Sequence, residues 1–155
     1  MEKIDRTGWG AGPWDEEGDF EVFDTQAGYL GVVDRNSLGS LCGYIAVPNG
    51  HPWHGVDYDN IHAEGGDYVE VHGGLTYSRK NSGEIGTPDT PRSWWVGFDC
   101  AHLGDLVPAM IRLRDVVSVA MMETYRDFKY VKEEIESLAQ QAKDALVALQ
   151  EGPDA

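Results

Sequence analysis

The residues of this sequence that are best suited to chemistry lie between positions 51 and 105. All five histidines fall in this range, among many glycines and aromatic residues. The densest group is Asp99, Cys100 and His102, followed by Asp105, directly after the apolar run 94–98. In an extended chain Cys100 and His102 project to the same side, because side chains alternate along a strand. The pattern indicates a site and leaves its chemistry open.

Three chemistries compete for these residues. Cys100 with a histidine base would form a thiolate nucleophile, Cys, His and Asp side chains would hold a metal ion, or the pocket would hold a polar ligand through hydrogen bonds. Taken singly, each residue more often has a structural role: a free cysteine is commonly a small buried apolar residue, and Asp105 is predicted to be a helix N-cap. The candidate catalytic residues are His72, Asp99, Cys100 and His102.

Histidines earlier in the chain extend the set of candidate ligands. His51 and His54 are three residues apart, a spacing that can chelate one ion from a turn. His72 precedes two glycines, where missing side chains let a ligand approach the backbone. A divalent metal ion would draw on His51, His54, His72, Asp99 and His102. A small polar ligand would be bound by His51, Trp53, His54, His72, Tyr77 and His102.

A small, mainly antiparallel sheet with long Gly- and Pro-rich loops must position these residues. Short runs rich in β-branched and aromatic residues are separated by turn-forming segments, which is typical of strands joined by hairpins and loops. Trp94 and Trp95 are neighbours in one such run and face opposite ways, so at least one is expected in the core. The predicted strands are 20–23, 29–33, 41–47, 68–71, 75–77 and 94–98.

The C-terminal third changes to a helical period. Apolar residues recur at intervals of three and four, which predicts a long helix over about 125–150, with Thr124 and Asp127 as its capping box. A second helix is predicted over about 106–122. The chain is therefore expected to be one α+β domain. Its parts are an irregular N-terminal arm (1–19), a sheet-and-loop body (20–104) and a helical part (105–155).

Charge and apolar pattern argue against several classes of protein. The net charge of −15 disfavours binding to nucleic acid, because phosphate backbones are bound by clustered Lys and Arg. No apolar run approaches the length of a membrane span, and the first residues do not resemble a secretory signal, so a cytoplasmic protein with two free thiols is expected. Phosphate-loop, GxSxG, dinucleotide, HExxH and paired CxxC motifs are absent.

Four strings resemble a group of small proteins encoded by phages and prophages. They are CGYIAVPNGHP at 42–52, VHGGLTYS at 71–78, WWVGFDCAHLGD at 94–105 and YRDFKYV at 125–131. The resemblance implies a setting, a phage accessory protein in the cytoplasm of a bacterial host that acts on a host defence or on nucleotide metabolism. It implies no catalytic residue, because the group brings no established mechanism.

Three functions are predicted. The first is a phage-type accessory protein that binds a small polar ligand, with a nucleotide-like defence signal as one option, in a pocket of histidines, aromatic residues and glycines. The second is a metal-dependent hydrolase with a His/Asp site, and the third is an acidic inhibitor that binds a host protein. A homo-oligomer would form if the apolar stripe of the 125–150 helix extends beyond the body that covers it.

Overall fold

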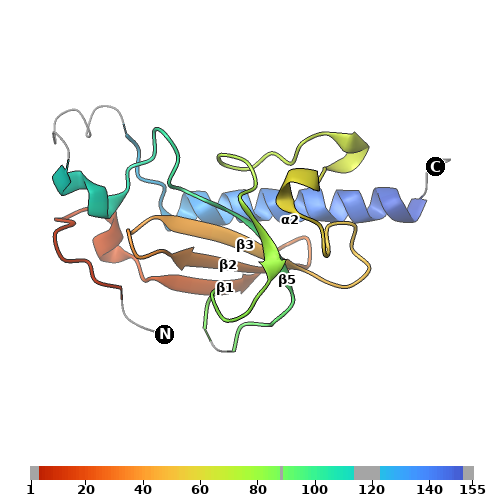
Figure 1. The fold of residues 1–155 in the computed structure, drawn as a ribbon, viewed down its shortest axis with the longest axis horizontal. Coiled ribbons are helices and arrows are strands. Elements are labelled where there is room, and N and C mark those ends of the chain that lie inside the picture. Colours follow the sequence, from red (N-terminus) through yellow and green to blue (C-terminus); the bar gives the residue numbers. More distant parts are fainter. Residues whose placement is uncertain (1–3, 88, 114–122, 152–155) are drawn as a thin grey trace.

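Five antiparallel strands form the centre of the protein, whose computed structural model describes residues 4–87, 89–113 and 123–151 (Figure 1). The strand order is β1-β2-β3-β5-β4. Because β3 and β4 both pair antiparallel with β5, they run parallel to each other and end where β5 begins. The strands are β1 (Phe20–Asp24), β2 (Leu30–Arg35), β3 (Leu41–Val47), β4 (Tyr77–Lys80) and β5 (Trp94–Asp99).

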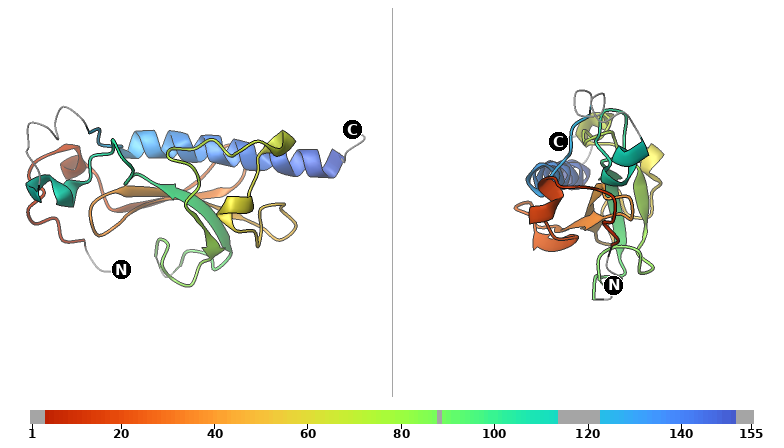
Figure 2. Two further views of the ribbon diagram at one scale, coloured as in Figure 1. Left: turned by 45° about the horizontal axis from the view of Figure 1, so that its top comes forward. Right: turned by 90° about the vertical axis from the view of Figure 1, so that its left-hand side faces the viewer.

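One long helix, α2 (Phe128–Glu151), lies along one face of this sheet (Figure 2). Its apolar stripe, including Ile135 and Leu138, is buried in the core between helix and sheet. Gly43 in β3 permits the close approach, since a Cβ there would lie 2.9 Å from Ile135 Cγ1 and 2.6 Å from the ring of Phe98. The arrangement confirms the predicted α+β class. No helix in the described ranges combines the length and the apolarity needed to cross a membrane.

The opposite face of the sheet is covered by the loop between β4 and β5. Ile85 from that loop packs with Val32 and Trp95, and all three are fully buried. Trp94 lies on the helix side of the sheet, where it is partly buried against the core. Trp95 is therefore the core tryptophan of the pair, and Trp94 remains partly open to solvent.

Three of the predicted elements have different boundaries. The strand predicted at 75–77 is observed as β4 at Tyr77–Lys80. The predicted capping box is wrong, because α2 begins after Asp127, whose Oδ1 accepts the Tyr130 N–H at 2.9 Å. In place of a second helix at 106–122 the described residues form a 3-10 helix, η4 (Pro108–Leu113), and residues 114–122 lie outside the described residues.

The predicted strand at 68–71 is also wrong. Tyr68 makes only an isolated bridge with His62. The backbone of Glu70 bonds to the helix instead of a strand, because Gln141 Oε1 accepts its N–H at 2.9 Å and Gln141 Nε2 donates to its carbonyl at 2.8 Å. With both backbone groups of Glu70 satisfied by one side chain, this segment stays a loop beside α2.

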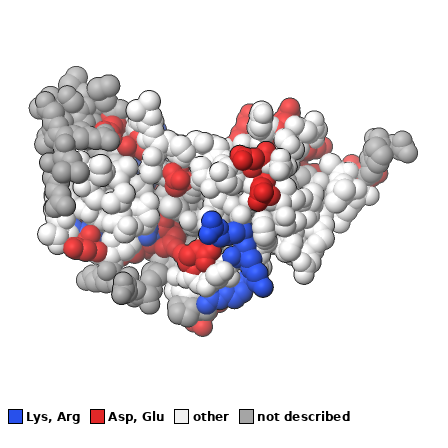
Figure 3. Space-filling model, in the orientation of Figure 1, with Lys and Arg blue, Asp and Glu red and all other residues white. Residues whose placement is uncertain are grey.

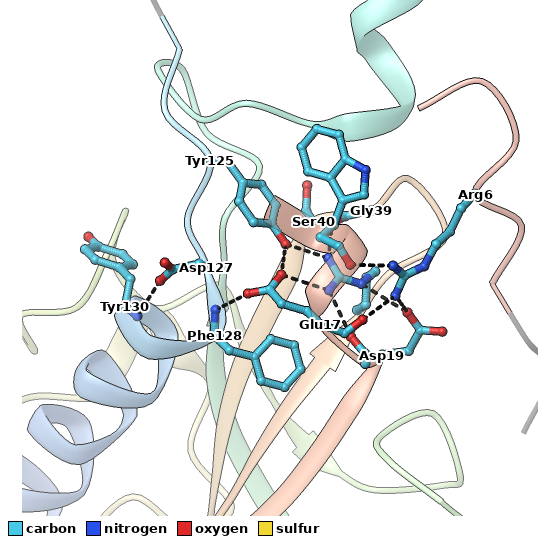
Figure 4. A network of polar contacts seen from close by, with 12 residues as sticks. Arg6, Glu17, Asp19, Gly39, Ser40, Tyr125, Asp127, Phe128 and Tyr130 are labelled. Carbon is cyan, nitrogen blue, oxygen red and sulfur yellow. Dashed lines mark hydrogen bonds and ion pairs between the residues drawn. The ribbon is translucent and has the colours of Figure 1, made fainter. Parts of the chain in front are cut away.

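The N-terminal arm is held against the body by a buried guanidinium (Figure 4). The side chain of Arg35, at the end of β2, is fully buried and donates hydrogen bonds to Tyr125 Oη at 2.7 Å and to the Gly39 carbonyl at 3.0 Å. It also pairs with two acids of the arm, Glu17 at 3.2 Å and Asp19 at 3.1 Å. Such a charge is tolerated in the interior only because all its donors find partners.

The arm reaches the start of α2 through the same network. Glu17 Oε2 accepts the backbone N–H of Phe128 at 2.8 Å, and Glu17 Oε1 accepts the hydroxyl of Tyr125 at 2.5 Å. Trp9 and Trp14 are buried at 4% exposure each, and Trp14 packs edge-on against Tyr125. The segment expected as an irregular arm is therefore an integral part of the core.

The surroundings of Asp34 in β2 predict that the stability of the folded protein depends on pH. Burial, together with the nearby charge of Asp19, raises the pKa of Asp34 to about 6, against the lowering effect of the Gly86 N–H that it accepts. An unfolded Asp has a pKa of about 3.9, so between these values the folded state holds a proton that the unfolded state has lost. The stabilising contribution of protonated Asp34 to the free energy of unfolding is therefore fully present below the unfolded pKa and is lost as pH rises through 6.

We therefore expect Asp34→Asn to raise the melting temperature more at pH 7 than at pH 4.5. The measurement is thermal unfolding at both pH values, and Asp24→Asn, at an exposed position of β1, is the control for loss of one negative charge. Equal effects of Asp34→Asn at the two pH values would contradict the raised pKa.

Candidate functional site

The segment after β5 lies beside the chain that enters α2. The Leu106 N–H donates to the Thr124 carbonyl at 2.8 Å, and the Thr124 N–H donates to the Gly104 carbonyl at the same distance. This parallel bridge, formed by Asp105 and Thr124, fixes the loop 100–105 close to the first turn of the helix.

A tight turn brings His72 to the same place. The Gly74 N–H donates to the Val71 carbonyl at 2.9 Å, and Gly73 and Gly74 have φ angles of +69° and +80°, which side-chain-bearing residues rarely adopt. The two glycines therefore allow the chain to reverse directly after His72. The imidazole Nε2 of His72 then lies 2.9 Å and 2.8 Å from the two carboxylate oxygens of Asp105.

Two acids lie near His72 and His102, and Asp105, with 3% exposure, is more buried than Asp99. Besides His72, Asp105 accepts the backbone N–H of His102 at 3.0 Å and the Nε–H of Arg126 at 3.1 Å. Burial alone would raise the pKa of Asp105, but these hydrogen bonds outweigh it and hold the pKa below its usual value. Asp105 is therefore a carboxylate, fixed by four contacts.

Tyr130 fixes the second nitrogen of His72. Its hydroxyl lies 2.7 Å from Nδ1, and the two rings are perpendicular with centroids 5.3 Å apart. Burial and the nearby charge of Glu134 raise the pKa of Tyr130, so the hydroxyl keeps its proton. Since a carboxylate only accepts, we assign the proton of His72 to Nε2, and Nδ1 accepts from Tyr130.

His102 closes the cluster and has a nitrogen without a hydrogen bond. Its ring packs on Gly73, where a Cβ would come within 2.3 Å of the ring. Its Nδ1 is buried, forms no hydrogen bond with any described residue, and lies 3.4 Å from Asp99 Oδ1 and 3.7 Å from Asp105 Oδ2. One donor atom each from His72, His102 and Asp105 lies within 4.8 Å of the others. These three residues are called the His–His–Asp cluster below.

Cys100 is close in sequence to the cluster but belongs to the core. It is 2% exposed, and burial, together with the charge of Asp105, raises the pKa of its thiol far above the ordinary value. A protonated, inaccessible thiol is a poor nucleophile. This environment argues against the alternative in which Cys100 attacks a substrate.

The other predicted ligands lie elsewhere. His51 is a core residue whose Nε2 donates to the Ala142 carbonyl at 2.8 Å and whose Nδ1 accepts the Trp53 N–H at 3.0 Å. Both nitrogens therefore bond to backbone groups inside the core, where burial lowers the pKa of His51. Among the described residues, His51 is not part of the group whose ligand atoms converge. Trp53 is 1% exposed, and its Nε1 donates to the His62 carbonyl at 2.9 Å.

Tyr77 and His54 are also apart from the cluster. Tyr77 packs on the face of the sheet opposite α2, and its hydroxyl donates to Glu84 at 2.5 Å. His54 lies against Trp94, with ring centroids 5.9 Å apart. Of the residues predicted from sequence, the structure therefore brings together His72, Asp99 and His102.

Three residues of the site were missed in the sequence. Asp105 was interpreted as a helix cap, yet its carboxylate is the centre of the hydrogen bonds. Arg126 and Tyr130 were not singled out and appear only within the string at 125–131. Their spacing of four residues was the available signal, because it places the guanidinium 5.0 Å from the ring centroid of Tyr130.

By fold and site the chain is an α+β protein with a His–His–Asp cluster where the end of its sheet meets the start of its helix. Comparison of the sequence and the structure with protein-family models, curated proteins and solved structures found no match. The chemistry of the cluster is therefore argued from its own geometry.

Proposed function

We propose that the His–His–Asp cluster binds a divalent transition-metal ion and that the protein is a hydrolase of a small polar substrate. The observation that carries the proposal is the convergence of two imidazoles and one carboxylate, with donor atoms within 4.8 Å of one another. Two histidines and one acid, with further positions left for water, form a ligand set used by catalytic zinc and iron sites.

The surroundings of the three residues support the assignment. For His72 to bind the ion through Nε2, its proton would shift from Nε2 to Nδ1, which would then donate to the hydroxyl of Tyr130. Metal-binding histidines commonly bond their second nitrogen to another group in this way. The Arg126 guanidinium and the His102 amide orient the carboxylate of Asp105. The buried Nδ1 of His102 lacks a hydrogen-bond partner among the described residues. Coordination of a metal ion would use its lone pair.

Asp99 supplies a second carboxylate at the edge of the cluster. Its Oδ1 is 3.4 Å from His102 Nδ1 and accepts the Ala101 N–H at 3.0 Å, while its Oδ2 accepts the Thr76 hydroxyl at 3.3 Å. A divalent ion lowers the pKa of bound water toward neutrality. Asp99 is placed to accept a proton from such a water, and this role makes hydrolysis the reaction class that the site fits best.

The test is zinc binding by the purified full chain. We expect one zinc ion per chain by elemental analysis and calorimetry. His72→Ala and Asp105→Asn are each expected to weaken the affinity about 100-fold or more, because the first removes a ligand and the second replaces a carboxylate ligand by a neutral amide. The control is His62→Asn, which changes an exposed histidine away from the cluster and is expected to bind zinc as the unchanged chain does.

The hydrolase part has its own readout. Zinc-dependent turnover of p-nitrophenyl acetate or bis(p-nitrophenyl) phosphate is expected, and Asp99→Asn is expected to lower kcat while zinc remains bound. Failure to bind zinc, iron, manganese or nickel would refute the metal centre. Stoichiometric metal without turnover of either ester would contradict the hydrolase assignment.

Capture of a small polar ligand without chemistry is the second candidate. Its support is a separate pocket at the other end of β5, which is lined by Lys80, Arg92, His54 and Trp94. The phage setting remains a proposal that rests on the four strings of sequence. An inhibitor of a host protein is supported by the net charge of −15 alone.

A further inference from the structure

A second pocket lies at the other end of β5 from the His–His–Asp cluster. The ends of β3 and β4 meet the beginning of β5 here, because Trp94 pairs with both Val47 and Lys80. The loop that follows β3 turns back over these strand ends and contributes Asn49 and His54. The pocket has a volume of about 600 Å³, which lies in the range of small-molecule sites.

The pocket carries unpaired positive charge in a strongly acidic protein. Lys80 and Arg92 both line it, and within the described residues no carboxylate forms an ion pair with either. Figure 3 shows the Lys and Arg side chains of this face gathered in one area over β4 and β5. By contrast, Arg6, Arg35, Arg126 and Lys132 are each paired with an acid. Two cations that line one pocket and have no acidic partner among the described residues attract an anion locally, although the net charge of the chain is −15.

The strand pairing explains why Lys80 faces the pocket and its neighbour Arg79 does not. Residues directly opposite one another on neighbouring strands share a face of the sheet, so Lys80 lies on the face of Trp94. Its neighbour Arg79 pairs with Trp95 on the other face and stacks on Tyr77 at 5.2 Å. Lys80 therefore belongs to the pocket, whereas Arg79 does not line it.

An aromatic wall adds a second type of contact. The ring of His54 lies against the indole of Trp94, which is partly buried. The indole Nε1 of Trp94 is buried and forms no hydrogen bond with the residues that the structure describes. A ring system seated here would pack on the indole and on the imidazole.

We propose that this pocket binds a small anion that also carries an aromatic ring, of the mononucleotide class. Lys80 and Arg92 bind the phosphate, with the Arg guanidinium able to form two parallel hydrogen bonds. Trp94 and His54 bind the ring. Binding here does not depend on the metal centre, because Trp94 and Asp99 are the two ends of β5, about 17 Å apart at the rise of a strand.

The test is calorimetric titration of the full chain with AMP, adenosine and inorganic phosphate at low and high salt. AMP is expected to bind more tightly than either part, with an affinity that falls as salt rises. The double variant Lys80→Ala and Arg92→Ala is expected to weaken AMP binding at least about tenfold, since two charge-assisted contacts are lost. Arg79→Ala is the matched control, because it removes a charge from the same strand outside the pocket.

The outcomes separate this proposal from the metal centre. Zinc titration of the double variant is expected to match that of the unchanged chain, which also reports that the variant is folded. The proposal is overturned if AMP fails to bind at millimolar concentration, or if the double variant binds AMP as the unchanged chain does. Inorganic phosphate binding as tightly as AMP would overturn the part assigned to Trp94 and His54.

Discussion

Replacing Arg35 by methionine is expected to lower the free energy of unfolding by about 3 kcal/mol, the largest stability loss that we predict for a single substitution. The guanidinium is fully buried, and its removal leaves Glu17, Asp19 and Tyr125 without their shared donor. The remaining acids are 12% and 21% exposed, so water recovers part of the loss, and the expected cost is at the lower end of the range for a broken buried pair.

Urea and thermal unfolding measure this effect. A loss of 3 kcal/mol corresponds to a fall in melting temperature of roughly 6–12 °C for a chain of this size. Arg79→Met is the control, because it makes the same chemical change at an exposed position, and Arg35→Lys is expected to be intermediate, since an ammonium keeps the charge but cannot reach all the acceptors. A loss below 1 kcal/mol in Arg35→Met would contradict the role assigned to the network.

Gly73→Ala is expected to weaken zinc binding at the His–His–Asp cluster at least about tenfold, with little effect on the fold. The added methyl group would lie 2.3 to 2.5 Å from ring atoms of His102, so the imidazole must turn away. The ring is the mobile end of a loop side chain, which keeps the cost in stability small. What is lost is the position of one metal ligand.

Gly74→Ala is the matched control for this substitution. Gly73 and Gly74 both have positive φ, so alanine is strained at either position by about 1 kcal/mol. A Cβ on Gly74, however, would have no atom of the described residues within 4 Å. Equal loss of zinc affinity in both variants would show that backbone strain, not displacement of His102, is responsible.

The sheet and the long helix could be predicted because their signals are local. The apolar period of three and four appears as the buried stripe of α2 from Val131 to Ala145, whereas Leu149 at the end of the period is exposed. Strands β2, β3 and β5 follow apolar runs bounded by turn residues. The errors arose where side-chain hydrogen bonds decide the local structure. The side chain of Gln141 bonds to the N–H and the carbonyl of Glu70, so that no strand forms there, and Asp127 rather than Thr124 caps the helix.

The site could be predicted only in part, because it depends on contacts between distant segments. His72, Asp99 and His102 were recognised by residue type, but nothing local shows that Asp105 lies between His72 and Arg126. The same residue types misled at His51, which looks like a ligand in sequence and is a core hydrogen-bonding residue in space.

The second pocket could not be predicted from the sequence either, because it is also formed by distant segments. His54 was predicted as a ligand, but its partners Lys80 and Arg92 carry no motif and are separated from it by tens of residues. Only the pairing of Trp94 with both Val47 and Lys80 brings them together. Strand register, which decides the face of each side chain, was not fixed by the apolar pattern of short runs.

The attachment of the N-terminal arm has a consequence for the order in which the protein acquires its structure during synthesis. Glu17 bonds to Tyr125 and Phe128, residues 108 and 111 positions further along the chain. While a ribosome is still making the middle of the protein, the arm has no docking surface at α2, and Trp14 lacks its partner Tyr125. The arm leaves the ribosome before α2 but can dock only after α2 has been made, and until then its tryptophans are exposed to chaperones.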